Sequence, residues 1–96
     1  MSRKIQDKNV DFIFEAILNL QTLDECYDFF EDLCTVTEIK SISQRIVVAK
    51  MLRDKKVYSD IVSETGASTA TISRVNKALV YGSDGYKLAL EKMEEE

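Results

Sequence analysis

Hydroxyl and basic side chains are concentrated between residues 68 and 77 of this 96-residue chain. Serine and threonine hydroxyls donate and accept hydrogen bonds, arginine presents a planar fork of donors, and lysine is a compact charge on a flexible stem. These groups are suited to hydrogen bonds with base edges and phosphates. The group consists of Ser68, Thr69, Thr71, Ser73, Arg74 and Lys77.

The segment around this group, residues 58–80, has the pattern of a helix-turn-helix. Apolar spacing predicts two short helices, near 58–65 and 69–80, and Gly66 can supply the positive φ that a tight turn between them needs. Ser68 is a suitable N-cap for the second helix, because its hydroxyl accepts a backbone N–H. The positions where such a unit makes its internal contacts are occupied by Ile61, Thr65, Ala67, Ile72 and Val75.

The second helix would bring its first turn, residues 69–71, to the major groove of DNA, because small and hydroxyl side chains permit a close approach. Arg74 would contact a guanine or a phosphate, and Lys77 would contact the backbone. The candidate DNA-binding residues are Ser59, Ser68, Thr69, Ala70, Thr71, Ser73, Arg74 and Lys77. An ordinary helical hairpin with a Ser/Thr-rich turn has a similar pattern. Val62 departs from a helix-turn-helix, where the residue four before the glycine is usually small.

The net charge of −4 is unfavourable for a DNA-binding protein, but its distribution matters more than its sum. Residues 38–80 hold eight basic and four acidic side chains, whereas acidic side chains predominate in residues 1–37 and 81–96. Positive charge is therefore concentrated in the segment that contains the motif. Mixed charges that merely solvate helix faces would give a similar, modest excess.

The composition argues against several classes of protein. The chain has no histidine, which removes the usual general base and the commonest zinc ligand, so neither an enzyme nor a metal or cofactor site is expected. No apolar run is long enough to span a membrane, and the first residues do not resemble a signal peptide, which predicts a cytoplasmic protein with no membrane partner. Cys26 and Cys34 are expected to be small buried hydrophobes, with a redox-sensing thiol as the alternative.

Helical spacing of apolar residues extends over almost the whole chain, which predicts one all-α domain over residues 1–96. Two apolar stripes precede a helix that starts near Thr35 or Thr37 and is expected to be the longest and most buried. Thr22 can cap the second of these stripes, with Glu25 three residues later. The last helix is expected from about Ser83.

Three further positions carry predictions. Gly82 is expected to adopt positive φ at a helix C-terminus. Phe12 and Phe29 lie off the main apolar stripes of the first two helices, which favours a dimer interface over a wide core face.

Several motifs together resemble a known family. The run GASTATISRVNKAL (66–79) is similar to the helix-turn-helix of the bacterial tryptophan repressor, and the resemblance extends upstream through residues 33–56. LDECYDFFEDLCT (23–35), SQR (43–45) and TGASTATISRV (65–75) resemble more closely the YerC/YecD group of TrpR-related proteins. This resemblance implies a six-helix, TrpR-like intertwined homodimer that acts as a repressor of transcription on a palindromic DNA operator.

The resemblance also implies a ligand site, which would be vestigial in this chain. Its positions are occupied by Thr35, Arg45, Arg74, Val75 and Ala78, and Gln44 replaces Arg45 if the alignment has no gap. The family has a glycine where Val75 stands and a serine where Ala78 stands. A valine side chain would conflict sterically with an indole ring, so tryptophan is not expected to bind and any small corepressor is doubtful.

The leading hypothesis is therefore a sequence-specific, homodimeric, DNA-binding regulator of transcription. The alternative is a helical protein-interaction module with no DNA readout. In that case the basic middle segment would meet an acidic protein partner, and the Ser/Thr cluster would only cap a helix.

Overall fold

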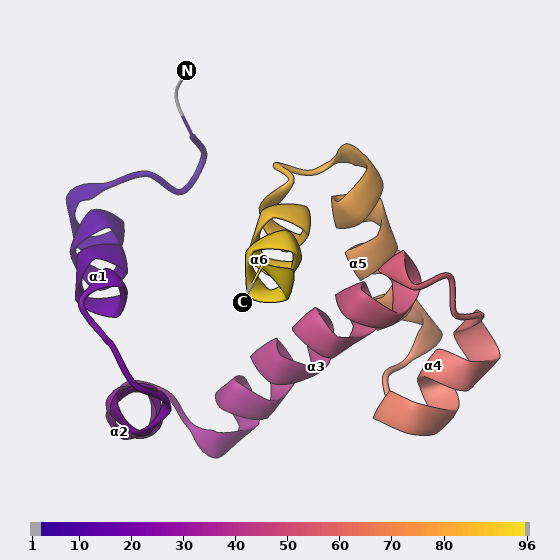
Figure 1. The fold of residues 1–96 in the computed structure, drawn as a ribbon, viewed down its shortest axis with the longest axis horizontal. Helices are drawn as coiled ribbons and strands as arrows, with labels where there is room; N and C mark the ends of the chain where they lie inside the picture. Colours follow the sequence, from indigo (N-terminus) through magenta and orange to yellow (C-terminus); the bar gives the residue numbers. More distant parts are fainter. Residues whose placement is uncertain (1–2, 96) are drawn as a thin grey trace. The chain divides into compact units, whose positions relative to one another are not determined.

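The structure is a computed structural model and describes residues 3–95. Within these residues the chain forms six α-helices and no strand, which confirms the predicted all-α class (Figure 1). The helices are α1 (Lys8–Leu18), α2 (Leu23–Leu33), α3 (Val36–Arg53), α4 (Tyr58–Thr65), α5 (Thr69–Tyr81) and α6 (Gly85–Glu94). They form two compact units, one that ends at Val36 and one that begins at Thr37.

The first unit consists of α1 and α2, and side chains fix where both helices start. Asp7 caps α1 by accepting the Val10 N–H at 2.8 Å. Thr22 caps α2 by accepting the Glu25 N–H at 3.1 Å, and Glu25 in turn accepts the Gln21 N–H at 2.9 Å. The cap predicted at Thr22 is therefore confirmed, although the glutamate reaches one residue further back than in the usual capping box.

Neither α1 nor α2 contains a buried residue. Phe12 is 74% exposed and Leu18 is 82% exposed, and other large apolar side chains of these helices are similarly open. Phe29 is half-buried and packs edge-on against Phe30, with ring centroids 5.4 Å apart. These helices thus owe little of their stability to side-chain burial within one chain.

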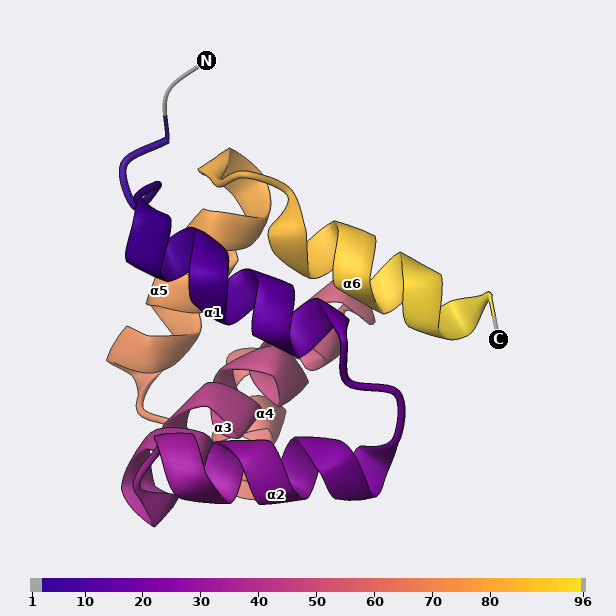
Figure 2. The same ribbon diagram turned by 90° about the vertical axis from the view of Figure 1, so that its left-hand side faces the viewer.

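The second unit contains the core, which lies where α4, α5 and α6 gather around the C-terminal half of α3 (Figures 1 and 2). All of the buried side chains of the described residues are apolar, and all lie in this unit. They are Val48, Ala49, Met51, Ile61, Ala67, Ile72, Val75, Leu79 and Leu90. The prediction that α3 is the longest helix is confirmed, but only its second half is buried.

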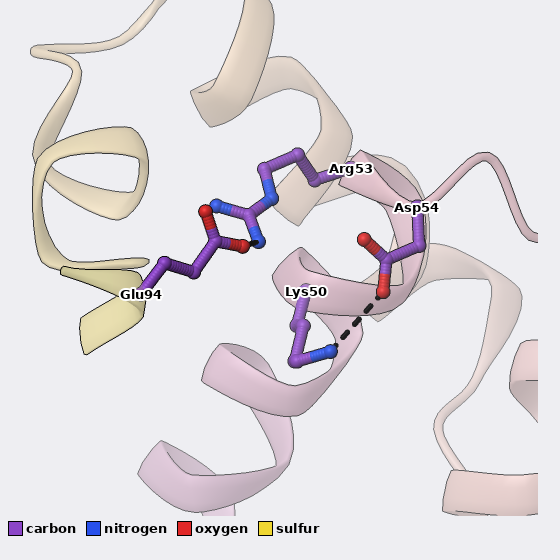
Figure 3. A network of polar contacts seen from close by, with 4 residues as sticks. All are labelled: Lys50, Arg53, Asp54 and Glu94. Carbon is purple, nitrogen blue, oxygen red and sulfur yellow. Dashed lines mark hydrogen bonds and ion pairs between the residues drawn. The ribbon is translucent and has the colours of Figure 1, made fainter. Parts of the chain in front are cut away.

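The last helix is held against α3 at both of its ends. Leu90 is buried in the common core and Tyr86 packs against it. Near the chain end, Arg53 of α3 forms an ion pair and hydrogen bond with Glu94 (Figure 3). One turn earlier in α3, Lys50 bonds Asp54 at 3.2 Å. The packing of Leu90 and Tyr86 and the Arg53–Glu94 pair fix α6 beside the end of α3.

The conformation predicted for Gly82 is wrong. Its φ is −84°, and the left-handed conformation falls on Asp84 instead, with φ 63°. Because the backbone turns at Asp84, α6 begins at Gly85, two residues later than expected. Gly82 is required for a different reason: a Cβ at this position would lie 2.3 Å from the Ala78 carbonyl oxygen.

Gly82→Ala is expected to lower the free energy of unfolding by about 1–3 kcal/mol, because the backbone must move to admit the new methyl group. Urea denaturation at a fixed protein concentration measures the change. Gly85→Ala is the matched control, since a Cβ at residue 85 meets nothing within 4 Å. The control should be neutral or stabilise by up to about 1 kcal/mol. An equal loss in both variants would contradict the steric explanation.

Candidate DNA-binding surface

The turn between α4 and α5 is tightly bonded. Gly66 has φ 72°, as predicted, and its N–H donates to the Val62 carbonyl at 2.9 Å. Thr65 donates its hydroxyl to the Ile61 carbonyl at 2.7 Å and accepts the Ala67 N–H at 3.1 Å. A left-handed glycine followed by side-chain bonds closes the turn without leaving its buried polar groups unpaired.

A residue of α3 also secures this turn. Gln44 is half-buried, and its Nε2 donates to the Thr65 carbonyl at 3.1 Å. That carbonyl lies at the C-terminus of α4, where it lacks a partner within the helix. Sequence spacing gives no signal for this bond, because the partners are 21 residues apart. The bond fixes the orientation of α4 relative to α3.

Ser68 is the N-cap of α5, as predicted. Its Oγ accepts the Thr71 N–H at 3.1 Å, and its hydroxyl donates to Thr71 Oγ1 at 3.1 Å. The hydroxyl of Thr71 is thereby oriented at the first turn of the helix, where the positive end of the helix dipole lies. The start of α5 is therefore well defined although its side chains are small.

The packing of α5 determines which of its residues face outward. Ile72, Val75 and Leu79 are buried in the core, together with Ile61 of α4. Because each residue advances about 100° around a helix, Ala70 lies opposite this buried stripe, and so do the residues three, four and seven positions after it. Ala70, Ser73, Arg74 and Lys77 are exposed on that side, and so are Thr69 and Ser68 at the helix start. Thr71 is half-buried at the edge of the buried stripe.

The outward surface of α5 is electrostatically positive. The helix contains no acidic residue, and its two charged residues are Arg74 and Lys77. Within residues 3–95 neither of them forms an ion pair, whereas Lys50, Arg53 and Lys87 are each paired with a carboxylate. Both cations therefore remain available to an anionic partner, in addition to the positive helix terminus.

The first helix of the pair contributes less charge. Ser59, one of the candidate DNA-binding residues, is exposed in the first turn of α4. Val62, the residue that departed from the usual pattern, is 37% exposed and not confined between the helices. Its bulk is therefore accommodated without moving α4 away from α5.

The five residues that the resemblance placed at a ligand site occupy different environments. Thr35 belongs to the first unit, and the other four belong to the second. Arg45 and Arg74 are exposed, Ala78 is half-buried, and Val75 is 2% exposed within the core. The valine side chain thus fills space between packed helices.

A shallow concavity of about 420 Å³ lies on the second unit, but none of these four residues lines it. Its walls come from one face of α3 and the end of α4. They are Lys40, Ser43, Gln44, Val47, Glu64 and Thr65. Gln44, the alternative to Arg45 in the alignment, lies here and its amide is engaged by the Thr65 carbonyl.

Comparison with known proteins matches residues 8–94 of the sequence to the family of the Trp repressor protein. The chain belongs to the Trp repressor family. It is 53% identical, over 96% of its length and 88% of the relative's, to YerC of Bacillus subtilis (strain 168), a protein described as uncharacterized. Within the family it therefore stands with the YerC-type proteins, as the motifs at 23–35 and 65–75 predicted.

Two solved structures share the fold. One, described as a candidate Trp repressor from Staphylococcus aureus, is 49% identical, with a TM-score of 0.92 over 99% of this chain and 98% of that one. The other, a TrpR-like protein from Eubacterium eligens ATCC 27750, is 57% identical, with a TM-score of 0.91 over 95% and 94% of the two chains. The TrpR-like fold expected from the sequence is thus confirmed.

Other kinds of site find no support in the part of the chain that is described. Residues 3–95 contain no group of three or more side chains arranged to hold a metal ion. Cys26 and Cys34 are half-buried and unpaired with each other. None of the helices among these residues is both long and apolar enough to cross a membrane.

Ser68→Ala should lower the free energy of unfolding by about 1 kcal/mol, because the Thr71 N–H loses its acceptor at the start of α5. Chemical denaturation measures the loss. Ser63→Ala provides the control, since Ser63 is exposed in the body of α4, where alanine is the better helix former. If both variants lost stability equally, the capping bond would not be the cause.

Proposed function

We propose that the protein is a homodimeric, sequence-specific DNA-binding regulator of transcription. The observation that carries the proposal is the exposed surface of α5, whose buried side is locked to α4 while its outward side combines hydroxyls, a small residue and two unpaired cations. Membership of the Trp repressor family supports a regulatory, non-enzymatic role.

In this proposal the N-terminal half of α5 enters the major groove. Ala70 keeps the helix narrow, so that Thr69 approaches the base edges, where its hydroxyl bonds a base and its methyl contacts thymine. Thr71, which is half-buried and bonded to Ser68, lies at the edge of this surface. Arg74 lies one turn further on the same side and forks onto a guanine or a phosphate. Lys77 and Ser59 meet the sugar-phosphate backbone, which sets the position of the helix in the groove.

Homodimer formation is supported by the apolar surface that one chain leaves open. Leu18, Leu23 and Phe12 are each more than 70% exposed in helices that bury nothing of their own. A surface of this kind is characteristic of a subunit interface. A two-fold axis would present two copies of α5, and the operator would then be palindromic, with half-sites roughly one helical turn apart.

We also propose that tryptophan is not a corepressor of this protein. Val75 is packed into the core beside Ile72 and Leu79, where its side chain fixes α5 without any ligand. Ala78 supplies no hydroxyl to hold an amino acid. The orientation of α5 is therefore set by side-chain packing, and DNA binding should not need a bound indole.

Arg74→Ala should weaken binding to DNA fragments selected from the genome by about 1–3 kcal/mol, because a charge-assisted contact is lost. Fluorescence anisotropy at fixed salt measures the affinity. The unfolding free energy should stay within about 0.5 kcal/mol, since Arg74 is exposed and unpaired.

Lys92→Ala is the matched control for this experiment. Lys92 is also an exposed cation of the second unit, but it lies in the last turn of α6. The control should bind as the parent does. If the Arg74 variant retained full affinity, the assignment of α5 as the DNA-contacting helix would be wrong.

Titration calorimetry with L-tryptophan should give no saturable heat in the micromolar range, because the Val75 side chain would conflict sterically with an indole ring. In parallel, added tryptophan should leave the affinity for selected DNA unchanged. Saturable micromolar binding, or a rise in DNA affinity with tryptophan, would overturn the proposal of corepressor-independent binding.

A further inference from the structure

The end of α3 holds a lysine in an unfavourable backbone conformation. Lys55 has φ 66°, in the left-handed region that side chains with a Cβ rarely adopt. Its N–H donates to the Leu52 carbonyl and the Lys56 N–H donates to the Met51 carbonyl, both at 3.0 Å. This pair of bonds is a Schellman motif, in which Lys55 occupies the position that is usually glycine. The chain therefore keeps a charged side chain where glycine would be less strained.

The cations around this turn fall into two groups. Lys50 is neutralised by Asp54, and Arg53 is paired with Glu94 of α6 (Figure 3). Lys55 and Lys56 are exposed, and within residues 3–95 neither forms an ion pair. Along the sequence, the nearest acidic residues are Asp54, which is bonded to Lys50, and Asp60, which is exposed in the first turn of α4. The lysine pair is thus a local positive patch.

The position of this patch relates it to the proposed DNA-binding unit. Lys56 precedes the first residue of α4 by two positions, and α4 packs directly on α5. In helix-turn-helix proteins the second helix occupies the major groove while the first crosses the sugar-phosphate backbone. A lysine pair just before the first helix would therefore lie near the phosphates that flank the groove. Arg74 and Lys77 follow that helix in the sequence.

We propose that Lys55 and Lys56 form a second phosphate-binding anchor, which clamps the DNA backbone next to the groove entered by α5. This inference rests on the proposed DNA-binding function and extends it to residues outside the helix-turn-helix. Lysine contacts to phosphate position a protein on the duplex without distinguishing sequences. The anchor therefore contributes equally to specific and non-specific binding, and its contribution is sensitive to salt.

The test compares the full-length protein with Lys55→Gln/Lys56→Gln, using a labelled mixed-sequence duplex and a fragment selected from the genome. At about 0.1 M salt both affinities should fall by about 5- to 30-fold, and the slope of log affinity against log salt should become shallower by about 1–2. The control is Lys87→Gln/Lys92→Gln, which removes the same charge from α6. Its affinities and slope should match those of the parent to within about twofold.

A second variant separates a binding role from a structural one. Lys55→Gly removes the charge but relieves the left-handed strain, so its melting temperature should rise by about 2–5 °C while its affinity for the mixed duplex falls. If the parent binds and the double glutamine variant keeps the parental affinity and salt slope, the anchor is wrong and the proposed function stands. If the parent itself binds neither duplex, the proposed function and the anchor are both overturned.

Discussion

The packing of α4 against α5 through Ile61, Ile72 and Val75 is the interaction on which the rest of the site depends. These side chains are essentially inaccessible to solvent, and close packing leaves α5 little freedom to rotate about its axis. With one side of the helix committed to the core, the opposite side, which carries Arg74 and Lys77, is held towards solvent. The Gly66 turn and the Gln44 bond to Thr65 then fix the angle at which α5 leaves the body of the unit.

The parts of the fold that depend on neighbouring residues could be predicted from the sequence. Gly66, the Ser68 cap and the Thr22 cap each involve residues no more than four apart, so their chemistry is visible in the sequence. Gly82 was misjudged because a glycine after a helix suggests positive φ, whereas here its lack of a Cβ is what matters. The strained Lys55 could not be foreseen, since lysine carries no sequence signal for a left-handed conformation.

The part of the candidate site that depends on local helical periodicity could also be predicted from the sequence. Helical periodicity places Ala70, Arg74 and Lys77 opposite the apolar stripe, and the structure shows all three exposed. The surroundings of the ligand-site positions could not be predicted in this way, because those positions came from a resemblance and not from helical periodicity. Their surroundings depend on packing between distant residues, which placed Val75 in the core and left Arg45 exposed.

Because α1 and α2 contain no buried residue, their stability depends on something other than packing within one chain. Helices of 11 residues are marginal in water without tertiary packing. In the proposed homodimer their apolar side chains are covered only when two subunits meet. The folding of α1 and α2 would then be second-order in protein concentration. In that homodimer, cellular copy number would set what fraction of α1 and α2 is folded, whereas the second unit has a core of its own.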